Sequence, residues 1–103
     1  MKILGIEHIG IAVDDLDKTS SFWGNIFNIL HTHTEVVKSE QVKTTIYDTK
    51  KGKIELLSST SSNSVIEKFI KNKGTGIHHI CLEIDDISQA IIELEEKNIV
   101  LIN

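Results

Sequence analysis

A short pattern that occurs twice constrains the fold of this chain more than any other feature. Residues 8–15 and 79–86 match over eight positions at an offset of 71, and they share a histidine, an isoleucine and an Asp-Asp pair. In each copy apolar side chains alternate with others, as in a half-buried strand, and the Asp-Asp pair opens a helical pattern. The repeat indicates an internal duplication of a strand-then-helix unit.

Alternation, turn residues and helix caps predict the remaining elements. The predicted strands are residues 3–13, 31–38, 41–47, 53–58, 77–84 and 99–102. The predicted helices are residues 16–27, 64–73 and 87–97, capped by Asp15, Ser64 and Asp86. In the first helix we expect five side chains to face the core, those of Leu16, Phe22, Trp23, Ile26 and Phe27.

Charge and composition exclude several classes of protein. Lysine and arginine number 11 against 15 acidic residues, a net charge of −4, and no basic stripe is present, so a nucleic-acid partner is not expected. No apolar run approaches the roughly 20 residues of a membrane span, and the first residues do not form a signal peptide. A single cysteine fits a reducing cytoplasm, where we expect the protein to act.

The two histidines of the repeat are the candidate functional residues. Side chains alternate with period two, so His8 and His79 each lie opposite the large aliphatic side chains of their own strands. If the duplicated strands lie side by side, both imidazoles point into one concavity, and Glu55 can point there too. Two neutral imidazoles and a carboxylate are a usual first shell for a divalent transition metal. The alternative is two hydrogen-bonded histidines and a solvated Glu55.

Other polar residues carry weaker signals. The same period of two predicts that His78 faces away from His79. His31, His33 and Glu35 share one strand face, but alternate residues of a strand are too far apart for a compact site, and a solvated edge strand is expected. Cys81 has no evident base partner, so we expect a buried reduced thiol.

Three stretches of the chain resemble the vicinal oxygen chelate superfamily, in which paired βαβββ modules cup a metal, and within it the methylmalonyl-CoA epimerases. They are residues 7–16, residues 53–57, and the segment from Asn63 to Ile70 followed by 74–80. The resemblance implies an α+β fold with a second module that is incomplete. It divides the single domain, 1–103, into a first module (1–58), a linker with a short helix (59–76) and a partial second module (77–103).

The resemblance also implies a function. It places His8, Glu55 and His79 on three of the family's four metal ligands, for cobalt, nickel, manganese or zinc. It implies epimerisation of methylmalonyl-CoA, a small-molecule acyl-CoA substrate, through a metal-stabilised enolate, by a homodimer. The fourth ligand, a second glutamate, falls beyond Asn103, so the 103-residue chain is expected to be C-terminally truncated and to have little or no activity. No general base is identified, and a glyoxalase I-like enzyme or a non-catalytic small-molecule-binding module are the alternatives.

Overall fold

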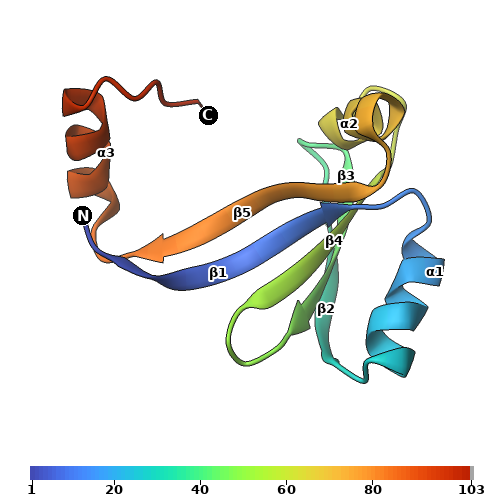
Figure 1. The fold of residues 1–103 in the computed structure, drawn as a ribbon. Helices are drawn as coiled ribbons and strands as arrows, with labels where there is room; N and C mark the ends of the chain where they lie inside the picture. The colour runs from blue at the N-terminus through green and yellow to red at the C-terminus, as the bar shows by residue number, and fades with distance from the viewer. Residues whose placement is uncertain (103) are drawn as a thin grey trace.

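The computed structural model describes residues 1–102, which form a mixed α+β fold built on one five-stranded sheet (Figure 1). The strands are β1 (Ile3–Ala12), β2 (Leu30–Val37), β3 (Val42–Asp48), β4 (Lys53–Ser59) and β5 (Gly76–Ile84). The helices are α1 (Leu16–Ser21), which continues into a π-helical turn (Phe22–Ile26), then α2 (Val65–Lys73) and α3 (Ile87–Glu96). The predicted α+β class is confirmed.

The two strands of the sequence repeat lie side by side in this sheet. Its strand order is β2-β3-β4-β1-β5, with β1 parallel to β4 and antiparallel to β5. The register places Gly10 of β1 opposite Glu55 on one side and His79 on the other. The candidate residues of the three adjacent strands β4, β1 and β5 are therefore brought close together around one glycine.

Two apolar clusters hold helices against opposite faces of the sheet. On one face Val13, Tyr47 and Leu56 are buried against Leu16 and Trp23, so α1 and the π turn cover that face. On the other face Ala12, Val42 and Leu57 pack with Ile66 of α2, close to one end of the strands. Because neighbouring residues of a strand point to opposite faces, Leu56 and Leu57 of β4 enter different clusters.

The first helix differs from the prediction in its second half. Asp15 caps α1 by accepting a hydrogen bond from Lys18 N at 3.0 Å, and Asn28 ends the helical segment with a φ of 59°. Between them, Phe27 N donates to Phe22 O at 3.1 Å, the longer spacing of a π turn. The wider turn rotates the apolar stripe. Leu16 and Trp23 pack on the core as predicted, but the expectation of a core position was wrong for three residues that are 43%, 68% and 53% exposed, Phe22, Ile26 and Phe27.

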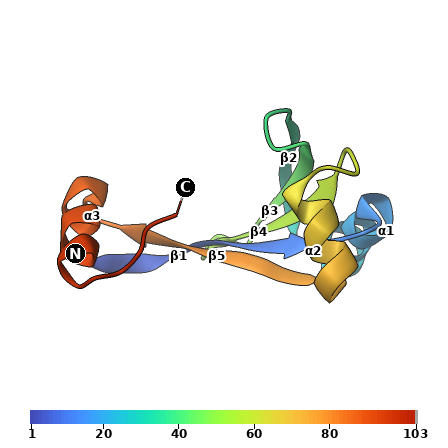
Figure 2. The ribbon, with the colours of Figure 1, turned by 90° about the horizontal axis from the view of Figure 1, so that it is seen from above.

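The C-terminal part of the chain lies at the far end of the β1–β5 ribbon. Helix α3 stands there, away from α1 and α2 (Figures 1 and 2), and its buried residue is Ala90. The predicted strand at residues 99–102 is wrong, since these residues have no strand structure and Ile99 N instead donates to Leu94 O at 2.9 Å. A strand needs a neighbouring strand to pair with, and Figure 1 shows this segment standing clear of the sheet. None of the described helices combines the length and apolar character needed to cross a membrane.

Candidate metal centre

His8 and His79 face each other across the β1–β5 pair. Their Nε2 atoms are 3.0 Å apart, and the rings meet nearly edge to face, at an interplanar angle of 88°. Both side chains are partly buried, with the His8 side chain 16% exposed. The structure therefore brings together the two histidines that the sequence repeat singles out.

Glu55 contacts the same histidine from the other side. Its Oε2 lies 3.2 Å from Nδ1 of His8, whereas His79 lies at Nε2 of that ring. Among the described residues, the group whose potential ligand atoms all lie within 4.8 Å of one another is Glu7, His8 and Glu55. His79 is not a member of that group. Glu55 and His79 thus both contact His8, but at different ring nitrogens. The ligand atoms of the three predicted residues therefore do not surround one point in the observed side-chain conformations.

Glu7 and His78 also belong to this cluster, although the sequence prediction did not include them. Glu7 Oε1 lies 2.8 Å from His8 Nδ1, and its Oε2 lies 3.2 Å from Lys53 Nζ. His78 Nδ1 lies 2.9 Å from His79 Nδ1. The prediction that His78 faces away from His79 is wrong, because an irregularity in the strand pairing breaks the period of two at this residue. The local sequence carries no signal for that irregularity.

Gly10 makes room for the His79 imidazole. A Cβ atom at this position would lie 2.3 Å from His79 Cε1 and 2.7 Å from both ring nitrogens. Side-chain atoms cannot approach so closely, so any other residue would displace the ring. The glycine of the first repeat is therefore part of the site, because the imidazole of the second repeat packs on it.

The electrostatics favour a neutral His79 and an ionised Glu7. Burial lowers the pKa of His79, and the neighbouring His8 and His78 rings lower it further. Hydrogen bonds from His8 and Lys53 lower the pKa of Glu7, and the same contact with Glu7 raises the pKa of Lys53. A neutral imidazole has a free nitrogen lone pair, which is the form that binds metals.

An apolar hollow of about 350 Å³ adjoins His79 on the α2 side. It is lined mainly by aliphatic side chains of the sheet and of α2, with Glu40, Thr44, His78 and His79 as polar members. Thr44 lies beside Leu57 in the β3–β4 register. A small molecule bound at His79 could place an apolar group in this hollow.

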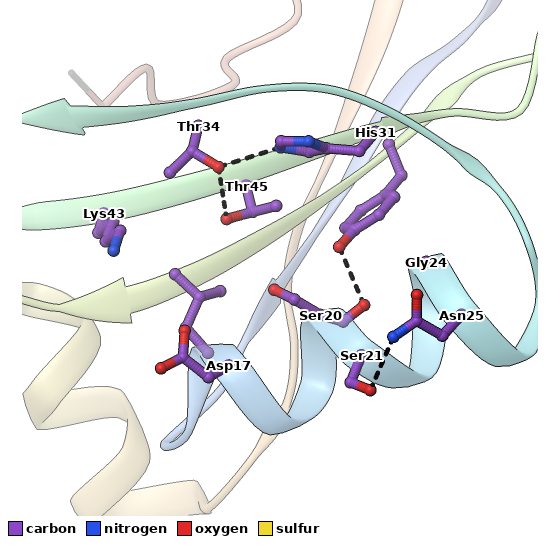
Figure 3. A pocket seen from close by; sticks show the side chains of 11 residues that line it. Asp17, Ser20, Ser21, Gly24, Asn25, His31, Thr34, Lys43 and Thr45 are labelled. Atoms are coloured by element: carbon purple, nitrogen blue, oxygen red, sulfur yellow. Dashed lines mark hydrogen bonds between the residues drawn. The ribbon is translucent and has the colours of Figure 1, made fainter.

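The other histidines lie elsewhere. His31 lines a separate polar hollow between α1 and strands β2 and β3, where its Nε2 lies 3.1 Å from Thr34 Oγ1 (Figure 3). That hollow lies on the α1 face of the sheet, with Thr45 and Tyr47. His33 and Glu35 approach to 3.7 Å, and both side chains are more than half exposed, as expected for a solvated edge strand. Cys81 is a free, partly buried thiol.

The donor atoms around His8 suit a divalent transition metal. Metal–nitrogen bonds are about 2.1 Å long, so two Nε2 atoms 3.0 Å apart can both contact one ion. Glu55 could join them if its carboxylate or the His8 ring turned about a side-chain torsion. Imidazole and carboxylate donors together are typical of zinc and of the neighbouring first-row metals.

The amino-acid sequence is similar to a known superfamily and to a characterised epimerase. Residues 7–103 match the Glyoxalase/Bleomycin resistance protein/Dioxygenase superfamily. The mitochondrial methylmalonyl-CoA epimerase of Mus musculus is 34% identical over 99 residues, which are 95% of this chain and 56% of that protein. The chain thus spans little more than half of this relative.

Solved structures of similar fold include two bacterial proteins. A hypothetical protein of Bacillus halodurans matches with a TM-score of 0.90 and 35% identity, over 95% of this chain and 71% of that one. Methylmalonyl-CoA epimerase of Streptomyces coelicolor, solved in complex with 2-nitronate-propionyl-CoA, matches with a TM-score of 0.83 and 28% identity, over 94% of this chain and 74% of that one.

Proposed function

Because the chain belongs to the Glyoxalase/Bleomycin resistance protein/Dioxygenase superfamily, we propose that it is a metal-dependent epimerase of methylmalonyl-CoA or a similar 2-methyl-branched acyl-CoA. The observation that carries the proposal is the His8–His79 pair, whose Nε2 atoms lie 3.0 Å apart in a chain that is 34% identical to an epimerase. We assign His8, Glu55 and His79 as ligands of one divalent ion, cobalt, nickel, manganese or zinc.

Two of the proposed ligands, His79 and Glu55, have surroundings that favour binding an ion. The lowered pKa of His79 leaves its imidazole neutral at neutral pH. Glu55 is partly buried, with 18% of its side chain exposed, and points toward His8 from the adjacent strand. A bound divalent ion would supply positive charge that stabilises an enolate oxygen of the substrate.

The apolar hollow next to His79 would orient the substrate. Aliphatic side chains of Val42, Leu57 and Ile66 line it, and they can cover a hydrocarbon part of an acyl-CoA while its oxygens face the histidines. Removing this surface from water favours binding by about 25 cal/mol for each Å² of apolar area. Thr44, which also lines the hollow, offers a hydroxyl for a polar contact.

Epimerisation also needs an acid–base group close to the carbon that loses its proton. Glu7 and Glu55 are carboxylates that contact His8. Glu55 is assigned to the ion, and the contacts of Glu7 with His8 and Lys53 lower its pKa and make it a weak proton acceptor. We therefore assign these residues to holding the ion, and we assign no proton-transfer role to either.

The test measures ion binding and proton exchange together. We expect the wild-type protein to bind Co²⁺ in calorimetry. Because no proton-transfer group is assigned among its residues, we expect these 103 residues to exchange the α-proton of methylmalonyl-CoA for deuterium in heavy water poorly or not at all, as followed by mass spectrometry. His8→Ala, Glu55→Gln and His79→Ala should weaken Co²⁺ binding, whereas His33→Ala, which removes an exposed histidine of β2, should not.

Three outcomes would contradict the proposal. Equal Co²⁺ affinity of the wild type and of the His8→Ala and His79→Ala variants would show that these histidines do not form a metal site. Turnover of a glutathione hemithioacetal without acyl-CoA exchange would indicate a glyoxalase I-like enzyme instead. Binding of Co²⁺ and acyl-CoA with no exchange, even by a longer chain that spans the full length of the epimerase relative, would indicate a non-catalytic binding module.

A further inference from the structure

Each of the two central histidines is preceded by a residue that contacts its Nδ1 atom. We infer that Glu7 and His78 are positioning residues, which β-bulges place so that they set the tautomers of His8 and His79 and turn both Nε2 atoms toward a common point. The inference rests on the proposed function only in naming that point as a metal site.

The strand register shows three irregularities between β1 and β5, and two of them lie at the residues that precede the central histidines. Ile6 pairs with Leu82 and His8 with Cys81, so Glu7 is an extra residue in β1. Gly10 pairs with His79 and Ile11 with Ile77, so His78 is an extra residue in β5. Without a bulge, consecutive side chains would point to opposite faces and could not touch. A bulge re-aims the side chain at the irregular position, and bulges are common next to active sites.

The two bulged residues occupy the same place in the sequence repeat. Glu7 precedes His8 as His78 precedes His79, at the same offset of 71. The contacts are also equivalent, since Glu7 Oε1 lies 2.8 Å and His78 Nδ1 lies 2.9 Å from the Nδ1 atom of the following histidine. The duplicated strands therefore position their histidines in the same way, but with side chains of different chemistry.

The partner of each Nδ1 decides where the proton of that imidazole lies. An ionised carboxylate only accepts hydrogen bonds, so Glu7 requires a proton on His8 Nδ1 and leaves a lone pair on His8 Nε2. His79 must then donate its Nε2 proton to His8, across the 3.0 Å contact. Its own Nδ1 accepts a proton from His78 Nδ1. With all three histidines neutral, this arrangement satisfies each of the hydrogen bonds that link Glu7, His8, His79 and His78.

The difference between the two partners matters when an ion is bound. His8 already presents a lone pair at Nε2. His79 can do so only if its proton lies on Nδ1. His78 Nδ1 can accept a hydrogen bond from that N–H, because His78 can carry its own proton on Nε2 instead. The three histidines then hold the same number of protons as before. His78 thus permits both states of His79, which a carboxylate at this position, able only to accept, would not.

Both positioning residues are held by a second contact. Glu7 Oε2 pairs with Lys53 Nζ at 3.2 Å, and the His78 ring packs edge-on against Phe69, with ring centroids 5.1 Å apart. Glu7 is also nearer to His8 Nδ1 than Glu55 is, at 2.8 Å against 3.2 Å. Glu55 can therefore turn away toward an ion without leaving that nitrogen unpaired.

The experiment pairs a disruptive and a conservative substitution at each position. Glu7→Leu and His78→Phe remove the contact with Nδ1 but keep a side chain of comparable size. Glu7→Gln and His78→Asn keep an amide that can reach the same atom. Glu95→Ala removes an exposed carboxylate of α3 and is the control. Folding of each variant is checked by thermal unfolding.

Two measurements follow. Long-range ¹H–¹⁵N spectra of the metal-free protein report which nitrogen of each histidine carries the proton. We expect Nδ1–H on His8 and Nε2–H on His79 in the wild type, a mixture at His8 in Glu7→Leu, and a mixture at His79 in His78→Phe. Zn²⁺ titration should then show affinity reduced about 10–100-fold in these two variants, the usual effect of losing an outer-shell partner, and largely retained in Glu7→Gln and His78→Asn.

The outcomes separate this inference from the proposed function. Unchanged tautomers in Glu7→Leu and His78→Phe would overturn the inference, as would equal losses of Zn²⁺ affinity in the conservative and disruptive variants. Altered tautomers in a protein whose wild type binds no Zn²⁺ would support the positioning roles and contradict the metal site.

Discussion

Replacing Gly10 with alanine should displace the His79 imidazole and disrupt the site with little effect on the fold. The added Cβ would lie 2.3 Å from His79 Cε1, so the ring must leave its position over β1. It would then lose its contacts with His8 Nε2 at 3.0 Å and with His78 Nδ1 at 2.9 Å. The backbone of Gly10 does not need glycine, because its φ is not positive.

The expected cost to stability is small. Two hydrogen bonds at about 1 kcal/mol each amount to about 2 kcal/mol. Replacing glycine by alanine in a compatible conformation returns about 0.4–1 kcal/mol by restricting the unfolded chain. The net loss is about 1 kcal/mol, or about 4–8 °C in Tm for a domain of this size. Affinity for Co²⁺ should fall by at least about 10–100-fold, since His79 itself moves and not only an outer-shell partner.

Gly76→Ala is the matched control. Gly76 lies on the adjacent strand β5, and a Cβ there would have no atom within 4 Å. It should leave Co²⁺ affinity unchanged and leave stability unchanged or slightly increased. Urea unfolding and calorimetric Co²⁺ titration of both variants make the comparison. Wild-type Co²⁺ affinity in Gly10→Ala would refute the reasoning, because it would show that His79 does not act from the position over Gly10.

Three other predictions concern the fold and its surface. Leu56→Ala, which leaves a cavity at a fully buried position of β4, should destabilise the protein by about 2–5 kcal/mol in urea unfolding. Leu82→Ala, at a half-exposed position of β5, should destabilise it much less, and equal losses of stability would contradict the packing described. The pKa of Asp85 is lowered chiefly by the backbone N–H of Lys2, so its stabilising contribution is present above the unfolded value of 3.8 and is lost as the pH falls through the lower folded pKa. Asp85→Asn should therefore destabilise the protein more at neutral pH than in acid below that folded pKa, and an equal difference under both conditions would be contrary evidence. Self-association of the protein is expected, because apolar side chains are exposed on β1, β5 and α3, among them Ile6, Ile80 and Ile87. Light scattering over a concentration series would reveal it, and a monomer at all concentrations would show that this surface does not mediate self-association.

The sequence alone determined the parts of this protein that depend on local patterns. Alternation of side chains predicted β1 and β5, and the caps at Asp15, Ser64 and Asp86 are confirmed by hydrogen bonds to the first turns of their helices. The eight-residue repeat, at an offset of 71, also predicted that the side chains of His8 and His79 would lie close together if their strands paired. These features follow from the period of a strand and from the unpaired N–H groups of a helix, which neighbouring residues decide.

Only the tertiary structure decided which residues surround the two imidazoles. Glu7 and His78 reach their histidines because each is an extra residue in the β1–β5 pairing, and a bulge depends on both strands at once. The closeness of Gly10 to His79 likewise depends on the register between segments that are far apart in the sequence. Residues 99–102 illustrate the converse, because they have the composition of a strand but no strand structure. A pattern read along one segment cannot contain the partner that completes it, since backbone hydrogen bonds of a sheet join two segments.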